Sequence, residues 1–226
     1  MEKKYELTDE ILEVGGHVLH RIKALRDFGN VKKGDIGGWI ECEDNLSHDD
    51  DCWVNGNAKV LGNAEVNGNA KVLGNAKVLG NAEVYGNAKV LGNAEVYGNA
   101  EVYGKAKVLG NAEVHGNAEV YGNAEVYGNA EVYGNAEVYG NAEVYGKAEV
   151  YGNAEVEKKS DYIVFKNWWS SGRYFTWTRS NDKWRVGCFY GTGEELIKKA
   201  YNDSDESGRE YERIVRYAEL IKQELK

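Results

Sequence analysis

Four histidines and three cysteines are the side chains of this 226-residue chain best suited to act as bases, nucleophiles or metal ligands. Only His115 lies within the regular repeats described below, at a position otherwise held by Tyr or Leu, and Cys42 and Cys52 fall on inward positions that favour a role in the core. No group of three histidines suggests a zinc site. Three consecutive aspartates at residues 49–51 could hold a divalent cation, although such loops are more often simply solvated. The sequence therefore predicts no catalytic residue, no metal and no cofactor.

The residues after position 157 interleave aromatic and arginine side chains, a combination that stacks on bases and pairs with phosphates. Side chains alternate along the expected strands, so one face of each strand should turn towards a core. Packing in that core is therefore the alternative role for many of the aromatic residues. The adjacent Trp168 and Trp169 are the best candidates, because neighbours in a strand cannot both face inward. The candidate residues for binding a small nucleotide ligand are Trp168, Trp169, Arg173, Tyr174, Trp177, Arg179, Trp184 and Arg185.

The central part of the chain is built from a six-residue repeat. From Val54 to Val156 a valine occupies every sixth position, and the unit reads V-x-G-N-A-[EK]. We interpret each unit as a short strand, A-[EK]-V-[YL], followed by a G-N corner, because Gly and Asn tolerate left-handed backbone. Side chains alternate along a strand, so Ala and Val should face inward while Glu or Lys and Tyr or Leu face outward.

The repeat resembles the hexapeptide pattern of left-handed parallel β-helices, the fold of many acyltransferases. The stretch from His20 to Val54, with Gly37-Gly38-Trp39, resembles hexapeptide-repeat proteins of bacteria and prophages, and the tail from Trp184 onward is similar to tails of phage-encoded proteins. The resemblance implies three hexads, or 18 residues, in each triangular coil, and a homo-oligomer, with a trimer favoured. The six-residue period alone does not exclude a flatter coil of 12 residues.

The predicted fold is mainly β, a left-handed parallel β-helix with an addition at each end. The domains are an N-terminal β cap at residues 1–35, the triangular solenoid at 36–157 and an α+β domain at 158–226. In the cap, strands are expected near residues 5–8 and 18–25. In the last domain we expect three strands, at 161–165, 174–179 and 183–189, and two helices that begin near Thr192 and Asp205.

With 18 residues per coil, outward side chains 18 apart stack in columns, one of which is acidic throughout. The other two charged columns begin with lysines, such as Lys71, Lys89 and Lys107, and end with glutamates. Such columns most often form a solvated surface. The alternative interpretation is that the acidic column is a docking face for a basic partner. Tyrosine columns beside them could stabilise the sheet by stacking or mediate self-association. The candidate partner-binding face is Glu83, Glu101, Glu119 and Glu137, and the candidate oligomer face is Tyr85, Tyr103, Tyr121 and Tyr139.

Composition narrows the class of protein. The chain carries 37 acidic and 28 basic side chains, a formal charge of −9, which argues against binding to bulk nucleic acid. No stretch approaches the apolar length of a membrane span, and the N-terminus lacks the apolar core of a signal peptide, so no membrane association is expected. The odd number of cysteines fits a reducing compartment. These features predict a cytoplasmic protein of a bacterial host cell.

The sequence favours a non-enzymatic binding protein, because no catalytic group and no loop insertion interrupts the repeats. The phage resemblance implies that such a protein counteracts a host defence component, by sequestering an anionic nucleotide or by presenting its acidic face to a host protein. Two alternatives stay open. One is an acyltransferase with an acyl-coenzyme A donor, which the fold resemblance implies and for which His115 would be the base. The other is a self-assembling scaffold.

Overall fold

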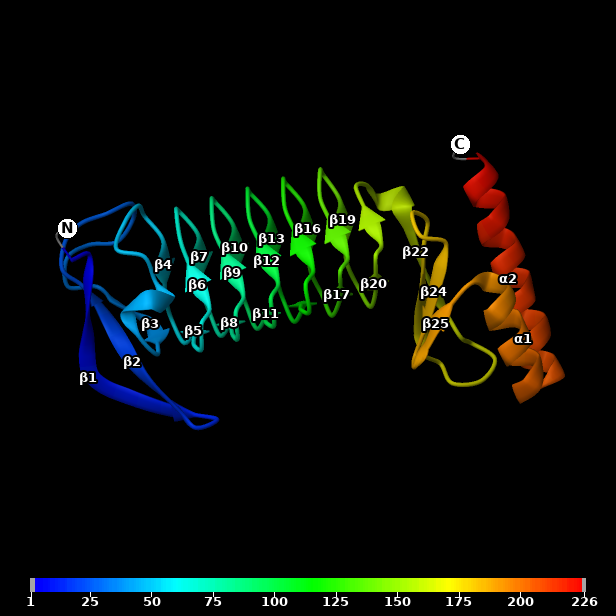
Figure 1. Ribbon diagram of the computed structural model, residues 1–226, viewed down its shortest axis with the longest axis horizontal. Helices are drawn as coiled ribbons and strands as arrows, with labels where there is room; N and C mark the ends of the chain where they lie inside the picture. The colour runs from blue at the N-terminus through cyan, green and yellow to red at the C-terminus, as the bar shows by residue number, and fades with distance from the viewer. Residues whose placement is uncertain (1–2, 225–226) are drawn as a thin grey trace.

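A computed structural model describes residues 3–224 and consists of a parallel β-solenoid of about seven turns with a separate structure at each end (Figure 1). The coils follow one another along the long axis, from the N-terminal hairpin to the C-terminal sheet and helices. Two short 3-10 helices, Glu43–Asn45 and Lys159–Asp161, lie where the chain enters and leaves the regular coils. The fold is therefore mainly β, as predicted.

Each of the three faces of the solenoid belongs to one sheet, in which the strands of the coils pair in parallel with the strands one coil away. The first face, continuous with the N-terminal sheet, holds β1 (Tyr5–Val14), β2 (His17–Ala24), β3 (Ile36–Ile40), β5 (Lys59–Val60), β8 (Lys77–Val78), β11 (Glu95–Val96), β14 (Glu113–Val114), β17 (Glu131–Gly134) and β20 (Glu149–Gly152). The second face holds β4 (Trp53–Val54), β7 (Lys71–Val72), β10 (Lys89–Val90), β13 (Lys107–Val108), β16 (Glu125–Val126) and β19 (Glu143–Val144). The third face holds β6 (Glu65–Val66), β9 (Glu83–Val84), β12 (Glu101–Val102), β15 (Glu119–Val120), β18 (Glu137–Val138) and β21 (Glu155–Val156).

Pairing between coils confirms the length of the repeat. Strand partners such as Glu101 and Glu119 are 18 residues apart, so each coil contains three hexads and the 12-residue coil is excluded. The repeat valines and alanines from Val54 to Val156 are all fully buried and form one continuous core. At the corners the backbone is left-handed, with a φ of +77° at Gly98. Strand alternation and the glycine corner thus act as the sequence predicts.

Parallel pairing joins each coil to the next by backbone hydrogen bonds. The backbone N–H of Glu101, for example, donates to the carbonyl of Ala118 at 3.0 Å. The outer edges of the first and the last coil have no further coil to pair with, so their backbone groups need other partners. The two end structures supply several of these partners.

Donors from the N-terminal structure reach carbonyls of the first coil. The ammonium of the fully buried Lys4 donates to the carbonyl oxygens of Asp49 and Cys52, both at 3.1 Å. The Tyr5 hydroxyl donates to the carbonyl of Leu46 at 2.7 Å. A buried ammonium is costly unless it is hydrogen-bonded, and these carbonyls supply its acceptors.

Acceptors from the C-terminal structure reach N–H groups of the last coil. The hydroxyl of Thr176 accepts from the backbone of Glu149 at 2.9 Å, and that of Ser180 accepts from Glu155 at 2.7 Å. The carboxylate of Asp161 accepts from Glu157 at 3.0 Å. Side chains rather than a further strand therefore terminate the solenoid at this end.

The N-terminal hairpin also covers one face of the solenoid. Strands β1 and β2 are antiparallel, and β1 runs six residues further than the predicted strand at 5–8, past an irregular register between Leu7 and Ile11. Leu19 of β2 packs with Trp39 and Leu61 in a small buried cluster, with Leu79 beside it. The leucines on the N-terminal part of the first face are thereby shielded from solvent.

The C-terminal structure is an antiparallel sheet covered by two helices. It has four strands where the sequence pattern predicts three, because Gly187 adopts a φ of +56° and turns the chain within the predicted strand at 183–189. Tight antiparallel pairing then continues on both sides of that turn, from Val186 to Phe189. The elements are β22 (Tyr162–Lys166), β23 (Tyr174–Thr178), β24 (Lys183–Val186), β25 (Phe189–Gly191), α1 (Gly193–Asp203) and α2 (Asp205–Glu224). Within residues 3–224, neither helix is both long and apolar enough to cross a bilayer.

Candidate anion-binding groove

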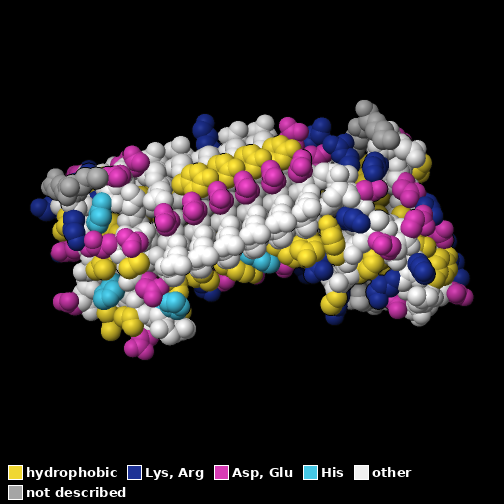
Figure 2. Space-filling view, in the orientation of Figure 1, with side chains coloured by type: hydrophobic (Ala, Val, Ile, Leu, Met, Phe, Trp, Pro, Cys, Tyr) yellow, Lys and Arg dark blue, Asp and Glu magenta, His cyan; other side chains and the backbone are white. Residues whose placement is uncertain are grey.

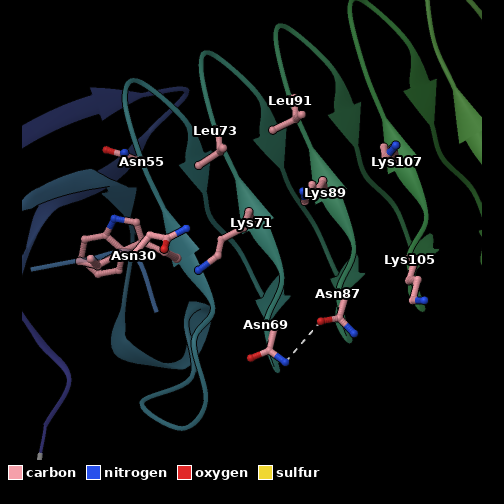
Figure 3. A pocket seen from close by; sticks show the side chains of 12 residues that line it. Asn30, Asn55, Asn69, Lys71, Leu73, Asn87, Lys89, Leu91, Lys105 and Lys107 are labelled. Carbon is pink, nitrogen blue, oxygen red and sulfur yellow. Dashed lines mark hydrogen bonds between the residues drawn. The ribbon is translucent and has the colours of Figure 1, made fainter. Parts of the chain in front are cut away.

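A hollow on the second face brings several lysines together over leucines. Lys71, Lys89 and Lys107 lie in register on β7, β10 and β13, on three successive coils (Figure 3). Leu73 and Leu91 lie beside them, and the hollow has a volume of about 770 Å³. We call this feature, lined by these five residues together with Lys105, Val31 and Trp53, the lysine–leucine groove.

Local pairing of residue types explains why the groove is hollow at this place. In the regular hexads every outward lysine is followed two positions later by leucine, and no outward glutamate is. Where glutamate occurs, the usual follower is tyrosine, whose hydroxyl donates to the glutamate of the next coil on the same face, as from Tyr103 to Glu119 at 2.7 Å. A lysine ammonium cannot accept such a bond, so a tyrosine in place of Leu73 or Leu91 would face Lys89 or Lys107 and find no acceptor there. The shorter leucine occupies both positions and lines the hollow.

The N-terminal structure closes one end of the groove. Trp53 of β4 is buried against Phe28 with ring centroids 5.3 Å apart, and Val31 pairs with Phe28 in an isolated bridge. These contacts hold the loop around residue 30 above the first lysine coil. The groove thus has an apolar wall at one end and remains open along the solenoid.

The three stacked lysines differ in how far their ammonium groups are already engaged. Lys71 donates to the carbonyl of Asp51, and burial lowers the pKa of Lys71, an effect that Asp51 opposes. Lys107 forms an ion pair with Glu125 at 2.6 Å. Between them Lys89 is exposed and, among residues 3–224, has no side-chain hydrogen bond or ion pair. Lys89 is therefore the ammonium most available to an anion.

A corner residue adds a fourth positive charge to the rim. Asn69 and Asn87 belong to a ladder of corner amides and are joined by a 3.4 Å hydrogen bond (Figure 3). Lys105 occupies the next place in that ladder, where the repeat otherwise has asparagine. The rim consequently offers amide donors and an ammonium side by side. Its chemistry suits an anionic group placed next to an apolar or planar one.

The third face has the opposite character, with an unbroken acidic column. Glu101 and Glu119 lie in register, and the rings of Tyr85 and Tyr103 stack with centroids 4.9 Å apart. Figure 2 shows the acidic row beside the row of hydrophobic side chains, running between the two end structures. Burial raises the pKa of Glu83, and the neighbouring carboxylates of Glu101 and Glu65 raise it further. We call this surface the glutamate–tyrosine face; its central residues are Glu83, Glu101, Glu119, Glu137, Tyr85, Tyr103, Tyr121 and Tyr139.

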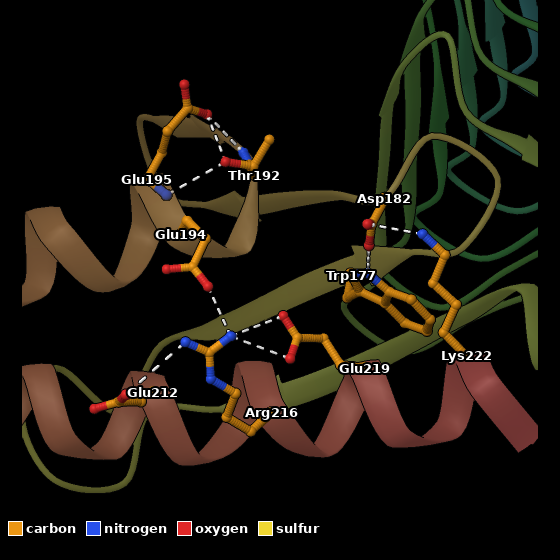
Figure 4. Close-up of polar contacts among 9 residues, drawn as sticks. All are labelled: Trp177, Asp182, Thr192, Glu194, Glu195, Glu212, Arg216, Glu219 and Lys222. Atoms are coloured by element: carbon orange, nitrogen blue, oxygen red, sulfur yellow. Dashed lines mark hydrogen bonds and ion pairs between the residues drawn. The ribbon is translucent and has the colours of Figure 1, made fainter.

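Several C-terminal residues singled out as ligand contacts are engaged in holding that structure together. Trp177 and Trp184 are each only 1% exposed and belong to the core between the sheet and the helices. The Trp177 indole donates to Asp182, whose other oxygen pairs with Lys222 of α2 at 2.8 Å (Figure 4). Arg216 links the two helices by pairing with Glu194 at 2.7 Å (Figure 4).

Two of the candidate arginines also have partners within the chain. Arg179 pairs with the carboxylate of Asp161, the residue that terminates the solenoid. Arg185 pairs with Glu149 at 3.1 Å, and its guanidinium lies over the rings of Tyr133 and Tyr151. Both arginines therefore join the C-terminal sheet to the last coils.

The remaining C-terminal candidates lie at the surface. Trp168 is 70% exposed, and its neighbour Trp169 packs edge-on against Tyr211 with ring centroids 4.9 Å apart. Arg173 and Tyr174 line two hollows, one of about 150 Å³ and one of about 480 Å³, and none of the other six candidates lines either of them. The eight candidates are thus divided between the core, the junction with the solenoid and a shallow surface, and they do not form one pocket.

The histidines likewise do not meet. His115 is stacked between Tyr97 and Tyr133, with centroids 4.6 Å and 4.8 Å away, and burial lowers its pKa. His48 stacks on Tyr5 and accepts a hydrogen bond from the backbone of Lys4. Over residues 3–224 no three His, Cys, Asp or Glu side chains are grouped as a metal site.

The lysine–leucine groove is the feature that reasoning from sequence did not identify as a site. The column of Lys71, Lys89 and Lys107 is visible in the sequence, but its cavity depends on a loop more than 35 residues earlier in the chain. The strict pairing of lysine with leucine was the signal that could have located it. In comparisons with known proteins, no protein-family model matches this chain and no curated protein does.

Proposed function

We propose that this chain is a non-enzymatic binding protein that holds a compact phosphorylated ligand of the nucleotide class in the lysine–leucine groove. The observation that carries the proposal is the exposed Lys89 ammonium, which lies between two other lysines and has no partner among residues 3–224. Strand spacing puts such neighbours about 4.8 Å apart. An anion would relieve the repulsion between these ammonium groups and gain charge-assisted hydrogen bonds.

The dimensions and composition of the groove support a ligand of this class. A volume of about 770 Å³ lies within the range of small-molecule sites. Leu73 and Leu91 offer apolar surface for a base, next to ammonium groups for phosphates. The lining residues are lysines, asparagines, leucines, one valine and one tryptophan, so none is suited to act as a general base or nucleophile near neutral pH. Binding without reaction is the function that this lining favours.

The finer assignment of the fold follows the same reasoning. Three hexads per coil support placing the solenoid with the left-handed hexapeptide-repeat β-helices. For the acyltransferase alternative, His115 would have to serve as the base, but it is enclosed in an aromatic stack on the first face rather than in the groove. We therefore favour binding over acyl transfer, and coenzyme A becomes one member of the ligand panel.

Isothermal titration calorimetry tests the proposal. The panel contains inorganic pyrophosphate, nucleoside mono-, di- and triphosphates, a cyclic dinucleotide and coenzyme A. We expect at least one phosphorylated compound to bind wild-type protein, and Lys89→Gln to weaken that binding by about 10-fold or more, since a hydrogen bond to a charged group contributes about 1.5–3 kcal/mol.

The matched control is Lys59→Gln, which removes a lysine from an equivalent lysine–leucine hexad on the first face. Its affinity should stay at the wild-type value. The proposal is wrong if no compound of the panel binds, or if the two variants lose affinity equally.

A further inference from the structure

Two surfaces of this chain repeat with the same step. The lysine stripe, which we define as Lys71, Leu73, Lys89, Leu91, Lys107 and Leu109, advances by one coil between successive lysines. The glutamate–tyrosine face advances by one coil between successive glutamates. Because both belong to the same coils, the two steps are identical. The free Lys89 can therefore face one carboxylate while Lys71 and Lys107, which would share their bonds to Asp51 and Glu125, face its neighbours.

The apolar columns beside the charges match in the same way. On the lysine stripe the leucines are half-buried, and on the opposite surface the tyrosine rings stack with centroids 4.9 to 5.2 Å apart. A contact that sets lysines against glutamates also sets leucines beside tyrosines. Apolar burial and charge pairing would then act over the same surface.

On the first face, a leucine that follows an outward lysine is covered by other apolar side chains. There Leu61, which follows Lys59, is covered by Leu19 of the hairpin and by Trp39. On the second face the equivalent Leu73, Leu91 and Leu109 have no such cover from residues 3–224. The same type of surface is thus shielded within the chain on one face and open on the other.

The glutamate–tyrosine face is already arranged to receive cations. The tyrosine hydroxyls donate to one oxygen of successive carboxylates, at 2.8 Å for Glu101, 2.7 Å for Glu119 and 2.8 Å for Glu137. This fixes the carboxylates in place, so less side-chain entropy is lost when they bind a partner. Six like charges in one column also repel each other, and positive groups would relieve that repulsion.

We propose that the lysine stripe of one copy docks on the glutamate–tyrosine face of a second copy of this chain. The two surfaces differ, so the contact is heterologous and each copy keeps one further surface free. Such contacts give a closed ring or an open filament, according to whether the rotation between copies closes. The inference does not depend on nucleotide binding. Both uses engage Lys89, so a bound phosphorylated ligand should compete with association.

Two neutralising variants test this contact without creating a new one. The first combines Lys71→Gln, Lys89→Gln and Lys107→Gln, and the second combines Glu83→Gln, Glu101→Gln, Glu119→Gln and Glu137→Gln. We expect wild-type protein to associate at micromolar concentrations in low salt and to dissociate as salt is added, measured by analytical ultracentrifugation. Each variant alone should associate about 10- to 100-fold more weakly.

The decisive measurement mixes the two variants. The first retains the acidic surface and the second retains the lysine stripe, so the mixture should form a one-to-one dimer and nothing larger. Uniform isotope labelling of one variant lets native mass spectrometry distinguish the two chains by mass. A first-face control, Lys59→Gln with Lys77→Gln, should associate like wild type.

Several outcomes would overturn the inference. They are a wild-type monomer at every concentration, association unaffected by both variants, or a mixture that stays monomeric although circular dichroism shows both variants folded. A trimer that neither variant weakens would point instead to contacts other than these columns. If wild-type protein binds no phosphorylated compound but still self-associates as expected, only the proposed function is contradicted. The two proposals can therefore fail separately.

Discussion

At the corners between stacked coils a single glycine has to satisfy two separate demands, a left-handed backbone and close contact with the next coil. Gly98 has a φ of +77°, and a Cβ built there would lie 3.0 Å from the backbone of Gly116 on the next coil. Gly146 has almost the same φ, +73°, but belongs to the last coil, and a Cβ there would have no neighbour within 4 Å. The two positions separate backbone strain from contact between coils.

We predict that Gly98→Ala lowers the free energy of unfolding more than Gly146→Ala does. Both variants pay the left-handed backbone cost of about 1–2 kcal/mol, and only Gly98→Ala adds a clash with backbone that costs about 1–3 kcal/mol more. Urea unfolding followed by circular dichroism gives the difference. An equal decrease in the free energy of unfolding for both variants would contradict the prediction, because it would mean that contact between coils adds nothing at Gly98.

At the scale of the strand, the outward residues act as matched pairs rather than as independent surface positions. Tyrosine stacks with tyrosine and donates to glutamate, while lysine accompanies leucine. Where the sign of a column changes, an ion pair joins the two coils, as between Lys77 and Glu95 at 2.6 Å. Within the central residues of the acidic column Glu83 is the exception to Glu101, Glu119 and Glu137, because the residue that would donate to it is Asn67 instead of tyrosine.

This exception gives a prediction with a defined pH dependence. Glu83→Gln should raise stability at pH 7 by a few tenths of a kcal/mol, on the order of one like-charge pair, because it removes repulsion with Glu65 and Glu101 and loses no tyrosine donor. The pKa of Glu83 is raised in the folded protein by burial and by those two carboxylates. Its charge therefore costs stability above the folded pKa, and the cost vanishes below the unfolded value of about 4.3.

Thermal unfolding of both proteins between pH 8 and pH 3.5 tests the sign. The melting temperature of Glu83→Gln should exceed that of wild type at neutral pH, and the two should converge on acidification. Glu119→Gln is the control, since it weakens the acceptor of the Tyr103 hydroxyl and should gain less. A variant that is less stable than wild type at pH 7 would contradict the prediction.

For the whole molecule, the unpaired backbone groups at the two ends of the solenoid decide what each end structure must provide. Lys4 and Tyr5 donate to carbonyls of the first coil. Thr176 and Ser180 accept from N–H groups of the last coil, and the Tyr162 hydroxyl donates to its Glu143 carbonyl. Open ends of parallel sheets invite further strands. The two end structures therefore limit the solenoid's length and keep its edges from pairing with other chains.

We predict that Thr176→Val exposes the dependence of the last coil on its cap. Valine has nearly the same shape but cannot accept from the backbone N–H of Glu149, and an unpaired donor at this junction costs about 1–3 kcal/mol. Hydrogen exchange at Glu149 should become faster. Thr178→Val serves as control, because the Thr178 hydroxyl donates to Asn181 and makes no bond to the solenoid. Unchanged exchange at Glu149 in Thr176→Val would contradict this role of the cap.

The sequence by itself determined the local structure of the repeats. Strand alternation buries valine and alanine, and glycine makes the corner, because both effects act within six residues. The C-terminal helices were equally predictable, since Thr192 and Glu195 form the expected capping box at the start of α1. The turn at Gly187 was not, because the apolar pattern on either side of it reads as one strand.

Tertiary structure decided which distant segments of the chain lie next to each other. The repeat period did not distinguish three hexads per coil from two, because that choice depends on pairing between residues 18 apart. Aromatic and arginine spacing could not tell that Trp177 and Trp184 face the helices, or that Arg185 meets Glu149 of the last coil. The lysine–leucine groove needed both the stacking of coils and the wall formed by Trp53 and Val31. Contacts of this kind join segments far apart in the chain, and only folding brings those segments together.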